Sequence, residues 1–338
     1  MTNPKTTARK PRAKRKGKAG AAEEQLESQA VVIDAEHLIQ HIVRVRILSR
    51  TFPTSNVWVL HDGGEAALID AGFGDDKSIE ARSDYLAREL SNLDFKVIAL
   101  THHHFDHSSG GRRLRDALKA DVAIHPLDEL LLHTPVETDD GNEDLPDEED
   151  LAERAKVWRE EAFNTPVDRT LADGETFRVG GLTVRAVHTP GHTAGHNSYW
   201  VEETGTLFTG DNVLGVGTSA ISPPPRGDME QYLRSLLRMQ ELNAKLLAPG
   251  HGPVVTATRA KIQELLDHRA TRDRQIIDLI ERGYSNDRQI RRALYPEIQK
   301  SLRRAATGQV RSHLARLVGQ GVVAVTEGEK EWSVTLTR

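Results

Sequence analysis

The feature that most constrains this chain is the run Thr101–His107, which holds four histidines and an aspartate. It follows an apolar stretch typical of a buried strand and precedes a helical pattern. On an extended backbone, residues two apart point the same way, so His102 and His104 can face one metal ion. The chain must then turn into the helix, which lets Asp106 and His107 face a second ion nearby.

Three further candidate ligands each come just after a short strand pattern: His192, Asp211 and His251. Loops that follow the strands of one scaffold commonly converge into a single site. Four clusters at four strand ends therefore predict one shared metal centre.

The ligand count predicts two ions. His102, His104 and His192 supply three nitrogens, the number found at an open catalytic zinc site. Asp106, His107 and His251 form a mixed set for the second ion. Asp211 is the predicted bridge, because a carboxylate has one oxygen for each ion. Two Zn²⁺ ions, with Mn²⁺ or Fe²⁺ as alternatives, would hold a metal-bound hydroxide as the nucleophile.

Other residues near these motifs receive different predicted roles. Asp106 and Asp211 are predicted to be catalytic as well as metal-binding. Asp70, which ends another strand pattern, is a predicted hydrogen-bond acceptor for a ligand histidine. His103, His188 and His196 are expected to lie outside the set of metal ligands.

The composition excludes some classes of site and of protein. The 338 residues include no cysteine, so disulfides and thiolate ligands are excluded. No apolar run approaches the length of a membrane span. We therefore expect a cytoplasmic protein with no membrane partner, which could be a monomer or a homo-oligomer.

Three parts of the chain are predicted: a basic tail over residues 1–28, a catalytic domain over 29–256 and a winged-helix domain over 257–338. The first 22 residues carry eight cations and no carboxylate. Such a tail is either a disordered solvated segment or an arm that binds polyanions. Residues 137–153 carry ten carboxylates and no cation. They predict a solvated loop, which would repel polyanionic substrates if it lined the active-site mouth.

Short strand patterns dominate between about residues 31 and 256. Three pairs of them flank turn sequences, at 62–64, 180–181 and 204–205, and these predict hairpins. Helical patterns interrupt the strands at three places: 79–90, 112–119 and 229–242. Strands with interspersed helices predict a layered α/β domain.

From residue 257 onward the pattern is helical almost to the end of the chain. Residues 285–287 predict the start of a helix over 288–294, and Thr307 is the predicted N-cap of a helix over 310–318. Strand patterns at 322–325 and 332–336 flank Gly328. Three helices followed by a two-stranded wing predict a winged helix-turn-helix.

The metal-binding residues resemble those of the metallo-β-lactamase superfamily, whose signature is His-x-His-x-Asp-His followed by distant His, Asp and His. The resemblance covers roughly residues 31–256 and implies an αββα sandwich. The segments Gly210–Gly215 and Pro249–Pro253, with the appended winged helix, are most similar to the β-lactamase-like protein 2 subgroup. The run Pro53–Trp58 departs from that subgroup. Having Asp211 and no cysteine argues against β-lactamase activity.

The resemblance implies a metal-dependent hydrolase but leaves its substrate open. One hypothesis is a single-stranded RNA endonuclease, favoured by the basic tail and by five cations in the winged helix: Lys300, Arg303, Arg304, Arg311 and Arg316. The alternative is a thioester or lactone hydrolase, acting on acyl-CoA or resembling glyoxalase II. In that case the winged helix would only pack against the catalytic domain. A third hypothesis is a DNA-binding regulator, in which Gln309 is the one obvious base-reading residue.

Overall fold

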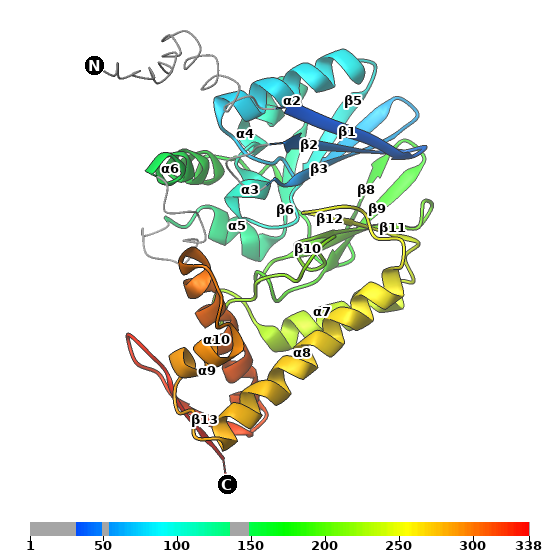
Figure 1. Ribbon diagram of the computed structural model, residues 1–338. Helices are drawn as coiled ribbons and strands as arrows, with labels where there is room; N and C mark the ends of the chain where they lie inside the picture. Colours follow the sequence, from blue (N-terminus) through cyan, green and yellow to red (C-terminus); the bar gives the residue numbers. More distant parts are fainter. Residues whose placement is uncertain (1–31, 49–53, 136–148, 338) are drawn as a thin grey trace, which may run out of the picture.

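Two β-sheets packed face to face form the framework of the catalytic region (Figure 1). The computed structural model describes residues 32–48, 54–135 and 149–337. The first sheet has seven strands in sequential order: β1 (Val32–Ile39), β2 (Ile42–Leu48), β3 (Asn56–Asp62), β4 (Glu65–Ile69), β5 (Asp94–Ala99), β6 (Asp121–Ile124) and β7 (Arg169–Thr170). The second sheet has the order β12-β11-β10-β9-β8, from β8 (Thr176–Val179), β9 (Leu182–His188), β10 (Asn197–Val201), β11 (Thr206–Gly210) and β12 (Leu246–Pro249).

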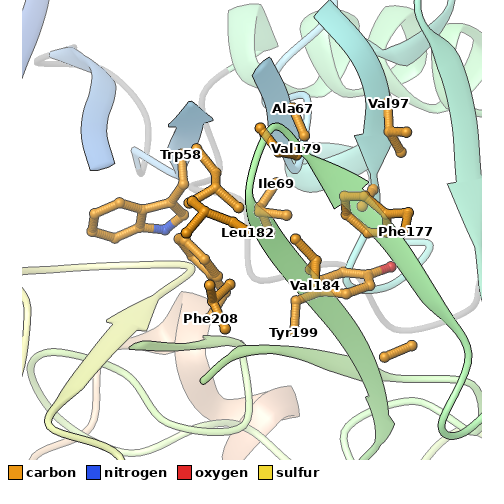
Figure 2. Close-up of a cluster of buried hydrophobic side chains, with 14 of the residues drawn as sticks. Trp58, Ala67, Ile69, Val97, Phe177, Val179, Leu182, Val184, Tyr199 and Phe208 are labelled. Atoms are coloured by element: carbon orange, nitrogen blue, oxygen red, sulfur yellow. The ribbon is translucent and has the colours of Figure 1, made fainter. Parts of the chain in front are cut away.

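Residues two apart along β4 belong to the same face, as the pleat of a strand requires. Ala67 and Ile69 pack between the two sheets, whereas Ala66 and Leu68 pack on the opposite face. Both faces of this strand are therefore buried, which explains its continuous apolar sequence. Figure 2 shows the layer between the sheets, where Trp58 and Phe208 from opposite sheets meet edge to face with ring centroids 6.0 Å apart.

Helices cover the outer face of each sheet. The first sheet is covered by α2 (Asp76–Glu89) and α4 (Gly111–Leu118), and the second by α7 (Met229–Glu241) and the start of α8 (Thr258–Glu281). Three further helices lie along the edge of the sandwich: α3 (Phe105–Ser108), α5 (Pro126–Leu132) and α6 (Glu149–Phe163). The layer order is therefore helix, sheet, sheet, helix, and the predicted αββα sandwich is confirmed.

The predicted hairpins are present. In the first, β3 and β4 pair in antiparallel register up to Asp62 and Glu65. Gly63 and Gly64 form its two-residue turn with φ of 58° and 87°. Two successive positive φ values are what a tight hairpin turn requires, and glycine meets this without strain.

The C-terminal region is a small helical domain with a two-stranded wing. Side chains from α8, α9 (Asp287–Leu294), α10 (Arg303–Gly319), β13 (Val323–Thr326) and β14 (Ser333–Leu336) share one apolar cluster. The predicted winged helix is confirmed. Because α8 contributes to this cluster and to the core beneath the second sheet, the boundary at residues 256/257 stays a prediction.

One helix start was predicted wrongly. Thr307 does not cap α10, which follows a short 3₁₀ turn (Lys300–Leu302) and begins at Arg303. The Thr307 hydroxyl donates to the Arg303 carbonyl 2.8 Å away, one turn earlier in the same helix. A threonine inside a helix can form this hydrogen bond with the preceding turn. A threonine in the sequence therefore does not by itself indicate the start of a helix.

Some predictions concern residues outside the described ranges. The basic tail lies outside them entirely, as does most of the acidic segment at 137–153. Among the described helices, none combines the length and the apolar character that a membrane crossing requires.

We predict that Phe208→Ala lowers the free energy of unfolding by about 3–5 kcal/mol. The Phe208 side chain is fully buried between the sheets, so the truncation leaves a cavity that the two sheets cannot close. Urea denaturation followed by circular dichroism measures the effect. Val216→Ala, at a side chain 72% exposed, is the control and should change the midpoint little. Equal effects of the two substitutions would contradict this account of the core.

Candidate metal centre

All seven predicted ligands come together at one edge of the sandwich, in loops that follow strands β5, β9, β11 and β12. His102 and His104 follow β5, and Asp106 and His107 lie in the short helix α3 that comes next. His192 lies in the loop between β9 and β10, Asp211 directly follows β11, and His251 follows β12. These strands belong to two sheets that pack against each other, and this packing brings the ends of the strands close together.

The first group consists of three histidine nitrogens. His102 Nε2 lies 3.1 Å from His104 Nδ1, and His192 Nε2 lies 3.0 Å from the same His104 atom. The three donor atoms lie within 4.8 Å of one another. This is the first of the two sets predicted from the ligand count.

The second group combines a carboxylate with two histidines. Asp106 Oδ2 is 3.0 Å from His251 Nε2 and 3.3 Å from His107 Nε2, and the two histidine nitrogens are 3.2 Å apart. Nδ1 of each ring faces an acceptor, Asp70 for His107 and the Thr54 carbonyl for His251, so the neutral form of each ring points an Nε2 lone pair at the other. A bound cation would relieve the repulsion between these lone pairs.

Asp211 lies between the two groups. Its Oδ2 is 3.8 Å from His192 Nε2 and 3.5 Å from His251 Nε2. Its Oδ1 is 3.4 Å from His107 Nε2 and, among the described residues, has no hydrogen-bond partner although it is buried. A buried carboxylate oxygen left without a partner is costly. The donor set and this unpaired oxygen together fit a pair of divalent cations.

A buried hydrogen-bond network orients the histidines of both groups. His107 Nδ1–H donates to Asp70 Oδ2 over 2.8 Å, which leaves Nε2 facing the centre. His102 Nδ1 lies 3.0 Å from Thr101 Oγ1, whose hydroxyl in turn donates to Asp70 at 3.0 Å. These partners assign the tautomer of each ring. The predicted role of Asp70 therefore gains geometric support and extends, through Thr101, to the first group.

The other two loop histidines are oriented by backbone carbonyls. His192 Nδ1–H donates to the Ala220 carbonyl at 2.9 Å, and His251 Nδ1–H donates to the Thr54 carbonyl at 2.8 Å. Sequence patterns did not reveal these partners, because a carbonyl acceptor leaves no trace in side-chain identity.

Gly250 permits the close approach of the second group. A Cβ at this position would lie 2.4 Å from Asp211 Oδ1 and 2.7 Å from His107 Cε1. Any side chain here would displace two candidate ligands. The glycine before His251 is therefore a requirement of the site's geometry.

Asp128 was not predicted, yet it joins two ligand loops. Its carboxylate accepts hydrogen bonds from the His103 backbone N–H at 2.9 Å, the Thr193 hydroxyl at 2.8 Å and the Gly195 backbone N–H at 2.6 Å. Burial alone would raise the pKa of Asp128, but His103 and these hydrogen bonds hold it well below its ordinary value. Its position in the first turn of a helix gave no signal of this role.

The three histidines predicted not to be ligands are placed outside both groups. The His103 ring lies 3.0 Å from Asp128, and His188 Nε2 lies 2.9 Å from the Ala194 carbonyl. His196 accepts a hydrogen bond from the Asp211 backbone N–H at 3.2 Å. Burial lowers the pKa of His196 to about 3, which keeps its ring neutral and able to accept this bond.

The two groups differ in their affinity for protons. Burial lowers the pKa of His102 and His104 well below the ordinary value, so their nitrogens carry free lone pairs. Burial would also lower the pKa of His107 and His251, but the nearby carboxylates outweigh it. The pKa of His251 rises to about 9 beside Asp211 and Asp106.

Comparison with known proteins finds two family matches along the chain. The family described as "Metallo-beta-lactamase superfamily" matches residues 50–251, and that described as "Beta-lactamase associated winged helix domain" matches residues 288–332.

Individual relatives cover most of the chain. A "Beta-lactamase-like protein 2 homolog" of Caenorhabditis elegans is 30% identical and aligns over 81% of each chain. An "Atrochrysone carboxyl ACP thioesterase" of Aspergillus novofumigatus is 32% identical over 79% of this chain and 72% of its own. The crystal structure of a metallo-beta-lactamase family protein from Thermus thermophilus superposes with a TM-score of 0.70 at 25% identity, over 89% of this chain and all of the other.

We predict that Asp70→Asn weakens divalent-metal binding by about 10- to 100-fold. Asparagine cannot accept hydrogen bonds from the Thr101 backbone and from His107 with the same pair of oxygens. It does tolerate the left-handed backbone of this position, where φ is 64°. Competition with a chelating dye measures the affinity, and Asp76→Asn at an 84% exposed carboxylate is the control. Unchanged affinity in Asp70→Asn would show that the network does not orient the ligands.

We also predict that metal affinity rises with pH up to about 9. Below this value His251 is protonated in the metal-free protein, so an incoming cation must displace a proton. Each displaced proton makes the apparent affinity rise by about tenfold per pH unit. Dye competition between pH 6 and 9 gives the slope. A flat profile would mean that His251 binds no metal.

Proposed function

Because the chain belongs to the metallo-β-lactamase superfamily, whose members are hydrolases, we propose that it hydrolyses an acyl thioester. The observation that carries the proposal is the gathering of seven donor side chains around Asp211. When bound, a pair of divalent ions lowers the pKa of water and polarises the scissile carbonyl. We propose zinc for both positions, with manganese or iron as alternatives.

The chain's own residues hold and orient the reacting groups. His102, His104 and His192 form one wall of the centre, and Asp106, His107 and His251 form the other. Asp211 lies between them, with carboxylate oxygens near histidines of both walls. The Asp106 side chain is 20% exposed, so its carboxylate can reach both the centre and an incoming substrate. Burial would raise the pKa of Asp106, but His107 and His251 hold it well below its ordinary value. We therefore propose that its carboxylate stays ionised and orients the attacking water by accepting a hydrogen bond.

A thioester suits this centre because its leaving group needs no proton. A thiol has an ordinary pKa near 8.5, so a thiolate departs readily at neutral pH. An alkoxide leaving from an RNA phosphodiester is far more basic and requires a general acid. The acyl oxygen gains negative charge in the transition state, and a cationic centre stabilises it.

The ion pairs of the winged helix weaken the case for nucleic acid. Arg311 Nε donates to Asp287 at 2.5 Å, within the winged helix. Arg316 Nε donates to Glu230 on α7 at 3.0 Å, and its guanidinium also pairs with Asp273 on α8. Two of the five cations that favoured RNA binding are thus held by carboxylates. RNA cleavage stays a prediction that the substrate test below addresses.

The position of α10 likewise favours a packing role over DNA recognition. Gln309 accepts a hydrogen bond from the Ile221 backbone N–H at 3.0 Å, so the residue expected to read bases faces the catalytic domain. The α10 helix also contacts α7. Relatives named as thioesterases, one at 32% identity, support the thioester substrate.

We predict that the metal-loaded protein hydrolyses a small acyl thioester such as an acyl-N-acetylcysteamine. Asp211→Asn should lower kcat by at least about 100-fold, the upper end of the cost of removing a ligand's supporting partner. Release of free thiol, detected with a disulfide dye, measures turnover. Asp84→Asn, at an exposed carboxylate on α2, is the matched control and should keep full activity.

The same preparation is incubated with labelled single-stranded RNA. Cleavage of RNA without thioester turnover, abolished by Asp211→Asn, would replace the proposed function with the endonuclease. Activity toward neither substrate after verified metal loading would also reject the thioester proposal.

A further inference from the structure

A cavity of about 360 Å³ lies between the loop that follows the metal ligands and the first half of α10. One wall is formed by Ala220–Arg226 of the catalytic domain. The other is formed by Arg304, Thr307, Gly308 and Arg311, which recur at helical spacing along one face of α10. Both domains are therefore needed to build this cavity.

The cavity wall begins at the metal centre. Ala220 lines the cavity, and its carbonyl accepts the hydrogen bond that orients the candidate ligand His192. Buried Arg269 on α8 donates to the carbonyl of the preceding residue, Ser219, at 2.6 Å. The loop between the centre and the cavity is thus fixed on both sides. One residue of the cavity wall therefore contacts a candidate ligand directly.

The lining is basic. It includes three arginines and, among its residues, no carboxylate. Asp287 already neutralises Arg311, whose guanidinium also stacks 5.0 Å from the Trp332 ring. Arg226 is exposed and has no ion-pair partner among the described residues. The excess positive charge of the cavity therefore includes Arg226, at the end of the Pro223–Pro225 run.

The same wall contains Gln309, whose side chain has a hydrogen-bond donor with no acceptor among the described residues. Gln309 Oε1 accepts from Ile221, which fixes the orientation of its amide. Its Nε2 is buried and has no hydrogen-bond partner among the described residues. Such a donor favours an occupant that carries oxygen atoms.

We propose that this cavity binds the phosphate-bearing arm of an acyl thioester, as found on coenzyme A and on phosphopantetheine carriers. This inference rests on the proposed function and names its substrate class. Arginine recognises phosphate through parallel N–H donors, and a volume of about 300–1,000 Å³ is usual for a small-molecule site. The flexible arm would place its phosphate near Arg226 and Arg304 while its thioester reaches the metal centre.

Coenzyme A alone tests binding without catalysis. Isothermal titration of the metal-free protein should detect binding, and Arg226→Ala should weaken it about tenfold. Arg226→Lys should be weakened less than Arg226→Ala, because it keeps the charge and loses only the parallel donors. Arg274→Ala removes an exposed arginine of α8 outside the cavity and should have no effect. Equal weakening by Arg226→Ala and Arg274→Ala would reduce the effect to overall charge and overturn the proposal.

Gly308 allows the cavity to be blocked without changing its charge. A Cβ at Gly308 would meet nothing within 4 Å, and Gly308 lines the cavity, so Gly308→Leu is chosen to fill part of it. Its matched control is Gly319→Leu, in the same helix, equally open and outside this cavity. We expect Gly308→Leu to raise KM for acyl-CoA at least tenfold with kcat nearly unchanged, and Gly319→Leu to leave both unchanged.

The comparison of two thioesters separates this inference from the proposed function. Acyl-N-acetylcysteamine lacks the phosphates, so its turnover should be the same in wild type, Arg226→Ala and Gly308→Leu. Equal changes for both thioesters, or unchanged KM for acyl-CoA in Gly308→Leu, would overturn the inference and leave the hydrolase intact. The protein could also bind coenzyme A, and lose this binding in the variants, while it hydrolyses no thioester. That result would reject the proposed function and support the binding site. RNA binding that depends on Arg226, without coenzyme A binding, would assign the cavity to RNA.

Discussion

The metal centre depends on one buried carboxylate, that of Asp70. It accepts hydrogen bonds from the Thr101 backbone N–H at 2.7 Å, from the Thr101 hydroxyl and from His107 Nδ1–H. Through Thr101 it also fixes His102, so a single side chain orients one histidine from each group. A carboxylate can serve in this way only if its own cost of burial is compensated, and three donors around one group provide that compensation. The strand ends that bring these donors together are held by the apolar layer between the sheets (Figure 2).

The sequence was most informative where function requires particular side-chain types. Seven ligand candidates could be named because His and Asp recur just after four strand patterns. The hairpins could be placed because glycine adopts the positive φ of their turns without strain. The partners of those ligands were harder to find. Ala220 and Thr54 act through backbone carbonyls, and Asp128 acts through tertiary contacts between loops far apart in the chain. Thr307 misled the prediction because a polar residue can serve inside a helix as well as at its start.

The winged helix is integrated with the catalytic domain through polar contacts as well as apolar packing. Asp273 on α8 is within hydrogen-bond distance of His313 Nδ1 at 2.7 Å and also pairs with Arg316, both on α10. Arg316 in turn reaches Glu230 on α7. A recognition helix free to enter a nucleic-acid groove presents its cations to solvent. Here Arg316 pairs with carboxylates of α7 and α8 and so holds α10 against the catalytic domain. The winged-helix fold therefore does not by itself indicate that α10 binds nucleic acid.

Contacts of this kind also connect α10 to the loop that orients a candidate metal ligand. Gln309 binds the backbone of Ile221, Arg269 binds that of Ser219, and the residue between them orients His192. A shift of α10 or α8 would therefore move the loop that sets one metal ligand. Catalytic geometry tolerates displacements of only a fraction of an ångström, so these contacts of the C-terminal domain support the position of a candidate ligand. The same contacts form the wall of the basic cavity. One set of interactions thus both holds the ligand and shapes the space in which a substrate arm would lie.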